Sequence, residues 1–450
     1  MSVDLLDELQ WRGLIHQCTD REGLAQLLAS GPQSVYIGFD PTADSLHAGS
    51  MMQLMLLRRF QSAGHRPIAL VGGATGMIGD PSGKSKERNL LDAEQLQKNV
   101  DGVAAQMRRF LDFDGDADKD TPARNNDTPA SNNDTPASSN AATLVNNYDW
   151  MRSYGYIEFL RDVGKAFPVG GMMAKESVRS RINSEAGLSY TEFSYMLLQA
   201  YDFVRLHDDH GCRIQAGGSD QWGNITAGID LGRRLRSASL FGLTAPLLTT
   251  ADGRKMGKTE QGAIWLDPAR TSPYEFHQYW RNVADADVMR CIAFLTEIPR
   301  RRYDELHRSV QEDPAGRLAQ TELADWMTRF VHGERGLASA TTAAKKLFSG
   351  DLSGATDESL AEMFADVPTA SLPMSSLQAD GLWVVQAMVA AGLAKSNGEA
   401  RRTIKEGGLY VDNARVGDDK MTLSPSHLTS ETVMVLRRGK KKYALLKFDP

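Results

Sequence analysis

The sequence has few cysteines and no long hydrophobic run. Its 450 residues include three cysteines, Cys18, Cys212 and Cys291, and none stands at a spacing typical of a zinc site or of paired disulfides. A reducing compartment fits this pattern. No apolar stretch approaches the roughly 18 residues that a membrane span needs, and residues 1–10 are acidic rather than ordered as a signal peptide. We therefore expect a soluble cytoplasmic protein with no protein-bound metal.

An excess of basic charge is also missing. The chain carries 51 Lys and Arg against 57 Asp and Glu, for a net charge of -6. This balance argues against a uniformly basic coat for nucleic acid, so any RNA contact must come from local patches. A chain of this length can form two or three domains with a large core.

Two short segments, far apart in the sequence, are typical of phosphate handling. The first, Leu46-His47-Ala48-Gly49-Ser50, follows a predicted strand at 34–40 and precedes a predicted helix at 51–60. A helix N-terminus favours negative charge because its backbone N–H groups are unpaired. The second, 254–259, holds Lys255 and Lys258 on either side of a glycine, so both can swing toward a developing pyrophosphate. Alone, such segments are more often a turn or a solvated loop; together they indicate ATP.

Between these segments lies Gly-Gly-Ser-Asp-Gln-Trp-Gly-Asn at 217–224. Read together, the three segments resemble class I aminoacyl-tRNA synthetases, most closely the bacterial tyrosyl-tRNA synthetase family, over nearly the whole chain. In this family a His-x-Gly-His signature and a Lys-Met-Ser-Lys-Ser-like loop flank one active site. The sequence departs from the first signature at Ser50, where the family usually has a second histidine, and 167–172 also differs from the usual pattern.

Strand and helix patterns alternate from Val35 to about Leu248 and predict a Rossmann-like, doubly wound parallel sheet as the catalytic domain, 1–248, with ligands at the strand ends. Within it, Asp-Thr-Pro-Ala recurs three times in a stretch with few large apolar side chains. We therefore predict a disordered insertion at 114–142. The pattern then turns helical, and 249–348 resembles the signature loop and the family's helical domain at the anticodon stem.

The end of the chain changes character again. A polar segment at 349–375 predicts a linker with one short helix, and 376–450 predicts a small α+β domain. Within 391–411 the pattern gives a basic helix, a Gly-Gly turn and a strand, which resembles an RNA-binding module of ribosomal proteins. Basic residues form two clusters, which would be a solvated face in an ordinary domain but here favour tRNA binding. The candidates are Arg401, Arg402, Lys405, Lys440 and Lys441.

Substrate choice depends on the segment 189–203. As a helix it places Tyr195, Gln199 and Asp202 on one face, through steps of four and three. A ligand with an ammonium and a phenol could pair these groups, although ordinary polar residues at a surface give the same pattern. In the family, residues that match Tyr195, Gln199 and Asp80 hold the amino acid's ammonium, and those that match Tyr36 and Asp202 bind its phenolic hydroxyl.

The resemblance implies the other site residues. Those approaching the ribose and phosphates of ATP or the carboxyl region of tyrosine match Asp40, Thr42, Gly49, Gly218, Asp220 and Gln221. Those of a mobile loop that reaches the phosphates match Lys84 and Arg88. With His47, Ser50, Lys255, Lys258 and Thr259, they complete the expected catalytic and ATP-binding set.

The reaction implied is activation of L-tyrosine by ATP with Mg²⁺, followed by transfer to tRNA(Tyr) on a homodimer. No side chain needs to act as a covalent nucleophile, because positioning and charge stabilisation suffice. A tryptophanyl-type synthetase shares the fold and both signatures, but the basic C-terminal module and the polar helix face favour tyrosine. A catalytically degenerate RNA-binding paralogue is the other alternative, and Ser50 motivates it.

Overall fold

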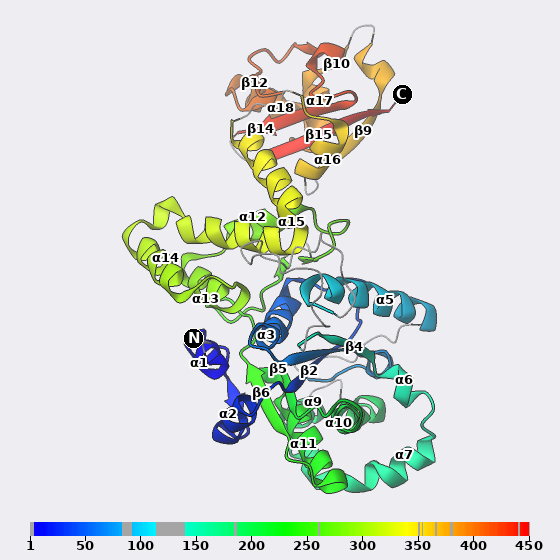
Figure 1. Cartoon of the computed structure of the whole chain (residues 1–450). Helices are drawn as coiled ribbons and strands as arrows, with labels where there is room; N and C mark the ends of the chain where they lie inside the picture. Colours follow the sequence, from blue (N-terminus) through cyan, green and yellow to red (C-terminus); the bar gives the residue numbers. More distant parts are fainter. Residues whose placement is uncertain are drawn as a thin grey trace, which may run out of the picture. The chain divides into compact units, whose positions relative to one another are not determined.

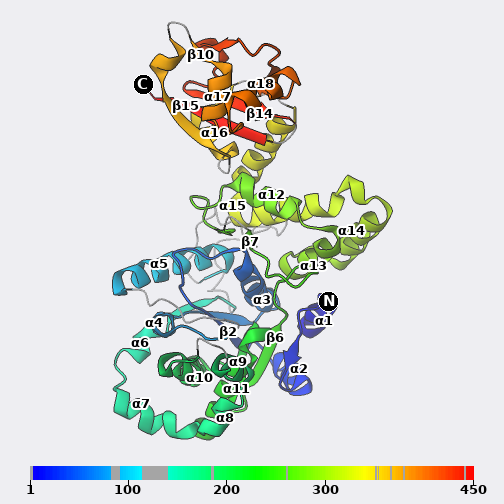
Figure 2. The same ribbon diagram turned by 180° about the vertical axis from the view of Figure 1, so that it is seen from behind.

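The computed structural model describes residues 4–82, 92–113, 140–183, 187–259, 262–349, 352, 354–364, 367–378, 381–439 and 442–449; Figures 1 and 2 show it from opposite sides. The chain divides into two compact units. One comprises Met1–Arg270 and Tyr279–Val331, and the other Thr271–Gln278 and His332–Pro450. Lys84, Arg88, Lys440 and Lys441 lie outside the described residues, as does most of the expected insertion at 114–142.

The first unit contains a six-stranded sheet in the order β1-β6-β5-β2-β3-β4. All neighbouring strands are parallel except β1, which is antiparallel to β6. The strands are β1 Gln17–Cys18, β2 Ser34–Phe39, β3 Arg66–Val71, β4 Thr143–Asn146, β5 Ile214–Gly218 and β6 Phe241–Ala245.

Helices cover both faces of this sheet, with α3 and α5 on one face and α10 and α11 on the other (Figures 1 and 2). The central strands are therefore buried, and β2 exposes only Gly38. This arrangement confirms the predicted Rossmann-like, doubly wound fold. The helices are α1 Leu5–Trp11, α2 Arg21–Ala29, α3 Met51–Ser62, α4 Thr75–Ile78, α5 Ala93–Phe110, α6 Tyr148–Met151, α7 Tyr156–Asp162, α8 Val169–Met173, α9 Glu176–Ile182, α10 Tyr190–His210 and α11 Trp222–Arg236.

The order of the strands has a switch point at one edge of the sheet. Strand β2 lies between β3 and β5. The chain therefore continues from β2 to β3 and β4 on one side of β2, and later adds β5 and β6 on its other side. Such a switch of direction opens a ligand-binding crevice at the carboxyl ends of the strands. The first signature follows β2 along the chain, and the segment 217–224 begins at the end of β5. Both segments therefore reach the same edge.

After β6 the chain forms a small hairpin and then helices. The hairpin pairs β7 Lys258–Thr259 with β8 Gly262–Ala263, and the helices are α12 Pro273–Arg281, α13 Asp285–Leu295, α14 Arg300–Glu312 and α15 Leu318–Ser349. Helix α15 is interrupted at Gly333, whose φ of 71° and ψ of -179° are not helical. Within the described residues, none of the helices combines the length and apolar character that a bilayer span requires.

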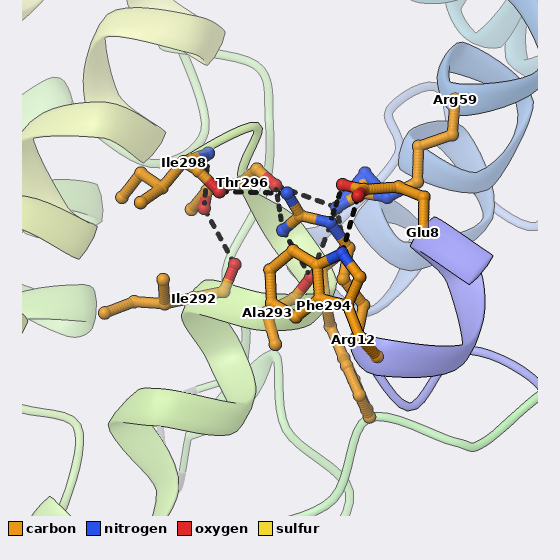
Figure 3. Close-up of polar contacts among 9 residues, drawn as sticks. Glu8, Arg12, Arg59, Ile292, Ala293, Phe294, Thr296 and Ile298 are labelled. Carbon is orange, nitrogen blue, oxygen red and sulfur yellow. Dashed lines mark hydrogen bonds and ion pairs between the residues drawn. The ribbon is translucent and has the colours of Figure 1, made fainter. Parts of the chain in front are cut away.

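Two buried arginines fasten the carboxyl end of α13 to α1 and α3 (Figure 3). Arg12 donates to the carbonyls of Ala293 and Thr296, both at 3.1 Å, and Arg59 donates to the carbonyl of Thr296 at 2.8 Å. Guanidinium groups suit this position because the last carbonyls of a helix carry partial negative charge. Burial lowers the pKa of Arg59 to about 9, which leaves it charged at neutral pH. Helix α13 is thus firmly held in the first unit.

The second unit contains a five-stranded sheet in the order β12-β11-β14-β15-β9. One face packs against α17 and α18, and the other, through Val433, Val435 and Leu445, against Leu360 and Phe364. The predicted basic helix and following strand appear as α18 and β11. The elements are α16 Asp357–Met363, β9 Thr369–Pro373, β10 Leu382–Trp383, α17 Val384–Ala390, α18 Asn397–Lys405, β11 Leu409–Val411, β12 Ala414–Arg415, β13 Thr422–Leu423, β14 Val433–Arg438 and β15 Lys442–Asp449.

The segment 349–375 is more structured than a linker. It contains α16 and also β9, which pairs in parallel with β15. The side chains of β9 alternate between half-buried and exposed, but most are small or polar. The hydrophobic signal of a strand is therefore weak, and the pairing partner lies much later in the chain. A strand of this kind cannot be recognised from local sequence.

Candidate active site

Helix α10 supplies one wall of the crevice. The Ser189 hydroxyl caps its first turn by accepting the backbone N–H of Glu192 at 3.2 Å. The Glu192 carboxylate in turn accepts two hydrogen bonds from Arg181, at 2.6 and 2.9 Å, in an ion pair that is almost fully buried. These contacts fix the start of the helix. Further along, Tyr195 donates its hydroxyl hydrogen to the Asp40 carboxylate at 3.0 Å, which joins α10 to the end of β2.

Two buried groups meet at the inner end of the crevice. The Asp202 carboxylate accepts hydrogen bonds from Asn147 Nδ2 at 3.0 Å and Trp150 Nε1 at 2.9 Å. The Tyr36 hydroxyl is buried and has no hydrogen-bond partner within the described residues. Burial raises the pKa of the Asp202 carboxyl to about 7 and that of Tyr36 well above its usual value, with the Asp202 charge adding to the shift in Tyr36.

A second polar cluster lies one helical turn earlier. Gln221 Nε2 donates to Asp80 at 2.6 Å, and Gln199 Nε2 donates to Gln221 Oε1 at 3.2 Å. Asn224 Nδ2 donates to Gln221 Oε1 at 3.2 Å and to Asp80 at 3.4 Å. Gln199 Oε1 is buried and finds no hydrogen-bond partner in the described part of the chain.

The described residues therefore leave two buried polar atoms of the crevice without a hydrogen-bond partner, Tyr36 Oη on β2 and Gln199 Oε1 on α10. A buried polar group without a partner costs about 1–3 kcal/mol, so these atoms indicate a ligand. A group that hydrogen-bonds to Tyr36 Oη, such as a hydroxyl, and a hydrogen-bond donor near Gln199 would satisfy them. The carboxylates of Asp80 and Asp40 make a positively charged donor favourable near Gln199.

The first signature forms the outer corner of the crevice. His47 Nδ1 accepts the backbone N–H of Gly49 at 3.0 Å, which places the ring hydrogen on Nε2. A side chain at Gly49 would come within 2.7 Å of the His47 ring, and one at Gly218 within 2.7 Å of the Asp220 carboxylate. A larger residue at either position would therefore displace the neighbouring side chain, His47 or Asp220. Ser50 precedes α3 without a capping hydrogen bond from its side chain.

The second signature lies directly against the first. Residues 264–266 run antiparallel to 46–48, where Ala48 N–H donates to the carbonyl of Ile264 at 2.7 Å. Ile264 N–H donates in turn to the carbonyl of Gly257 at 3.0 Å. Lys255 is exposed. For Lys258 and Thr259 the structure describes the backbone, as strand β7, but not the side chains.

The structure thus gathers the following candidates at one edge of the sheet: Tyr36, Asp40, His47, Gly49, Asp80, Tyr195, Gln199, Asp202, Gly218, Asp220 and Gln221. Thr42 is exposed in the turn after β2. Arg401, Arg402 and Lys405 are exposed on α18 of the second unit. Among the described residues no group of three His, Cys, Asp or Glu side chains could hold a metal.

Sequence reasoning missed four residues of the crevice: Thr75, Asn147, Trp150 and Asn224. The Thr75 hydroxyl donates to Asp40 at 2.9 Å and accepts from Asn147 Nδ2 at 3.1 Å, so these two residues link the two ends of the crevice. Asn224 ends the glycine-rich segment 217–224 singled out above, which was a usable signal, and Thr75 follows the glycines at 72–73. Asn147 and Trp150 follow β4, and nothing local distinguishes them from surface residues.

Comparison with known proteins agrees with this geometry. Residues 29–349 match the family of tRNA synthetases class I (W and Y), and residues 359–446 match the Tyrosine--tRNA ligase SYY-like C-terminal domain. The first match defines the class, and the second selects the tyrosine branch. The chain therefore belongs to the tyrosyl-tRNA synthetase family of class I.

Full-length relatives support this assignment. The chain is 65% identical to a tyrosine--tRNA ligase of Rhodopirellula baltica, over 99% of this chain and 96% of the relative. It is 48% identical to one of Bacillus caldotenax, over 99% of this chain and 100% of the relative. Among solved structures, a C-terminally truncated mitochondrial tyrosyl-tRNA synthetase of Aspergillus nidulans matches with a TM-score of 0.66 and 29% identity, covering 77% of this chain and 94% of that one.

Proposed function

We propose that this chain activates L-tyrosine with ATP and transfers it to tRNA(Tyr), as a tyrosine--tRNA ligase. The observation that carries the proposal is a pair of buried atoms without a hydrogen-bond partner among the described residues, Tyr36 Oη on β2 and Gln199 Oε1 on α10. The phenolic hydroxyl of tyrosine can donate to Asp202 and accept from Tyr36. Its ammonium can donate to Gln199 Oε1 and face Asp80. Phenylalanine would leave the first pair unsatisfied.

The reaction has two steps. In the first, the tyrosine carboxylate attacks the α-phosphorus of ATP, a new P–O bond forms, and pyrophosphate leaves with the electrons of the broken bond. Mg²⁺ enters as the ion carried by the ATP phosphates. His47 can donate from Nε2 to a phosphate oxygen, and Lys255 and Lys258 neutralise the departing pyrophosphate. In the second step a terminal ribose hydroxyl of tRNA attacks the tyrosyl carbonyl and AMP leaves.

Tyrosine-dependent exchange of labelled pyrophosphate into ATP tests this function. We expect exchange with tyrosine and none above background with tryptophan, because an indole N–H can donate to Asp202 but cannot accept from Tyr36, whereas a phenolic hydroxyl can do both. We expect Asp202→Ala to abolish the tyrosine signal. A paralogue without activity would bind tRNA but give no exchange with any amino acid, and a tryptophanyl-type enzyme would prefer tryptophan.

We also propose that the protein acts as a homodimer through a surface within residues 148–190. Among the described residues of this range, eight large apolar side chains are exposed: Tyr148, Tyr156, Ile157, Leu160, Val169, Met173, Ile182 and Tyr190. Ile157 is 70% exposed and Val169 64%, and a concentration of exposed large apolar side chains in one stretch of the chain favours an interface there. Because a homodimer is what the family resemblance implies, a second copy is the occupant we propose. Sedimentation should give a dimer, and Ile157→Asp with Val169→Asp should give a folded monomer.

A further inference from the structure

The centre of the second signature is fastened to α12 and α13 by contacts that involve neither lysine. Gly257 is buried, and its backbone N–H donates to the hydroxyl of Tyr279 at 2.7 Å. The neighbouring Met256 side chain is 7% exposed, and its Sδ lies 3.7 Å from Cys291 Sγ. Cys291 belongs to α13, the helix whose carboxyl end Arg12 and Arg59 hold (Figure 3).

These contacts fix the loop against the first signature. A Cβ on Gly257 would lie 2.5 Å from the backbone nitrogen of Gly49, so the two glycines touch at the corner assigned to ATP. Lys255 precedes the fastened pair and Lys258 follows it. The backbone positions of both lysines therefore depend on where Met256 and Gly257 are held.

We propose that the Tyr279 hydroxyl is a positioning group for adenylate formation, which holds the signature loop in the docked conformation seen here. This inference rests on the proposed function, since docking matters only if the loop acts on ATP. Without the hydroxyl, the buried N–H of Gly257 loses its acceptor, and the docked conformation becomes less favourable. The fraction of enzyme with both lysines in place falls accordingly.

Tyr279→Phe tests the proposal, because it removes one oxygen atom and keeps the ring. We expect hydrogen exchange at the loop peptide that contains Gly257 to become about three- to tenfold faster, the factor that corresponds to one ordinary hydrogen bond. We expect kcat for tyrosine-dependent pyrophosphate exchange to fall by a similar factor. The KM for tyrosine should stay within about twofold, because the residues assigned to tyrosine lie on β2, α10 and the segments after β3 and β5.

Tyr303→Phe is the matched control. Tyr303 lies on α14 of the same unit, and its ring packs edge-on against Trp11 with centroids 5.5 Å apart. We expect no change in loop exchange or kcat for this variant. Cys291→Ala provides an independent test, since it removes the sulfur that contacts Met256 and should reproduce the pattern of Tyr279→Phe more weakly.

An unchanged rate of hydrogen exchange at the loop peptide in Tyr279→Phe would overturn the proposal. Faster loop exchange with an unaltered kcat would also overturn it, because the contact would then be structural only. If the wild-type protein shows no tyrosine-dependent exchange of pyrophosphate, the proposed function itself fails. In that case, faster hydrogen exchange at the loop peptide in Tyr279→Phe but not in Tyr303→Phe would still support the docking contact. Equal hydrogen-exchange rates in the two variants would refute this contact.

Discussion

At the scale of single residues, Asp202, to which we assign the phenolic hydroxyl of tyrosine, has an unusual ionisation. Burial raises the pKa of this carboxyl from 3.8 to about 7, so the folded protein binds the proton more tightly than the unfolded chain does. Its contribution to stability is therefore fully present below about pH 4 and is lost as the pH rises through about 7. We expect the wild-type protein to lose more stability than Asp202→Asn between pH 5 and pH 8, measured by denaturant unfolding. An equal loss in both proteins would contradict this assignment.

Tyrosine binding should show the opposite pH dependence. In the proposed function the phenolic hydroxyl of tyrosine donates to Asp202. The ionised carboxylate is the better acceptor, so kcat/KM for tyrosine should rise as the pH increases through about 7. Discrimination against phenylalanine should reach roughly 10⁴–10⁵-fold, a magnitude taken from tyrosyl-tRNA synthetases themselves. Asp230→Asn, at an exposed position, is the control. It should change neither the pH dependence of kcat/KM for tyrosine nor the discrimination against phenylalanine.

His47 and Ser50 give a second prediction at this scale. If His47 Nε2 donates to a charged phosphate, His47→Ala should lower kcat/KM for ATP by about ten- to 150-fold, which corresponds to roughly 1.5–3 kcal/mol. Ser50→His should leave pyrophosphate exchange unchanged or raise it, because the longer imidazole can reach an oxygen that a serine hydroxyl cannot. A large loss in Ser50→His would mean that the corner is shaped around serine.

At the scale of elements, the flanks of the insertion define where it can be removed. Ala142 N–H donates to the carbonyl of Asp112 at 2.7 Å, and Asn140 exchanges two hydrogen bonds with Gln61, at 3.1 and 2.8 Å. A deletion that extended through residue 142 would break these contacts. We expect deletion of 114–139 with a short Gly-Ser join to preserve solubility and pyrophosphate exchange, since the two flanks already meet. A marked drop in melting temperature for this shorter deletion would show that the removed residues stabilise the fold.

Elements also show why sequence reasoning succeeded in some places and failed in others. Strand β2 and helix α3 were predictable because a continuous apolar run and strong helix formers are local signals. The face of α10 followed from helical spacing alone. Strand β9 was missed because its partner β15 is distant in the sequence, and Asn147 and Trp150 were missed because only the fold brings them to Asp202. The contact of Tyr279 with Gly257 likewise depends on tertiary structure.

At the scale of the whole molecule, the two halves of the reaction should be separable by truncation. All described residues assigned to tyrosine and ATP belong to the first unit, whereas α16 and β9 pack within the second. A cut near residue 370 would split the C-terminal sheet, so the cut belongs after 349. We expect this truncated enzyme to keep pyrophosphate exchange near the full level and to lose most tRNA charging. Equal charging by both forms would refute an RNA-binding role for the C-terminal part.

Charge reversal on α18 tests the same role in the intact chain. Arg401 stacks on Trp383, with the guanidinium carbon 5.1 Å from the ring centroid, so its replacement would also disturb packing. Arg402 and Lys405 are exposed and give a cleaner test. Because each lost phosphate contact reduces the slope of log affinity against log salt by about one, Arg402→Glu with Lys405→Glu should flatten the salt dependence of tRNA binding by about two. The control, Arg21→Glu with Arg66→Glu in the first unit, changes the net charge equally and should leave the slope unaltered. If both pairs flatten the slope alike, the effect reflects net charge, and α18 is not the contact.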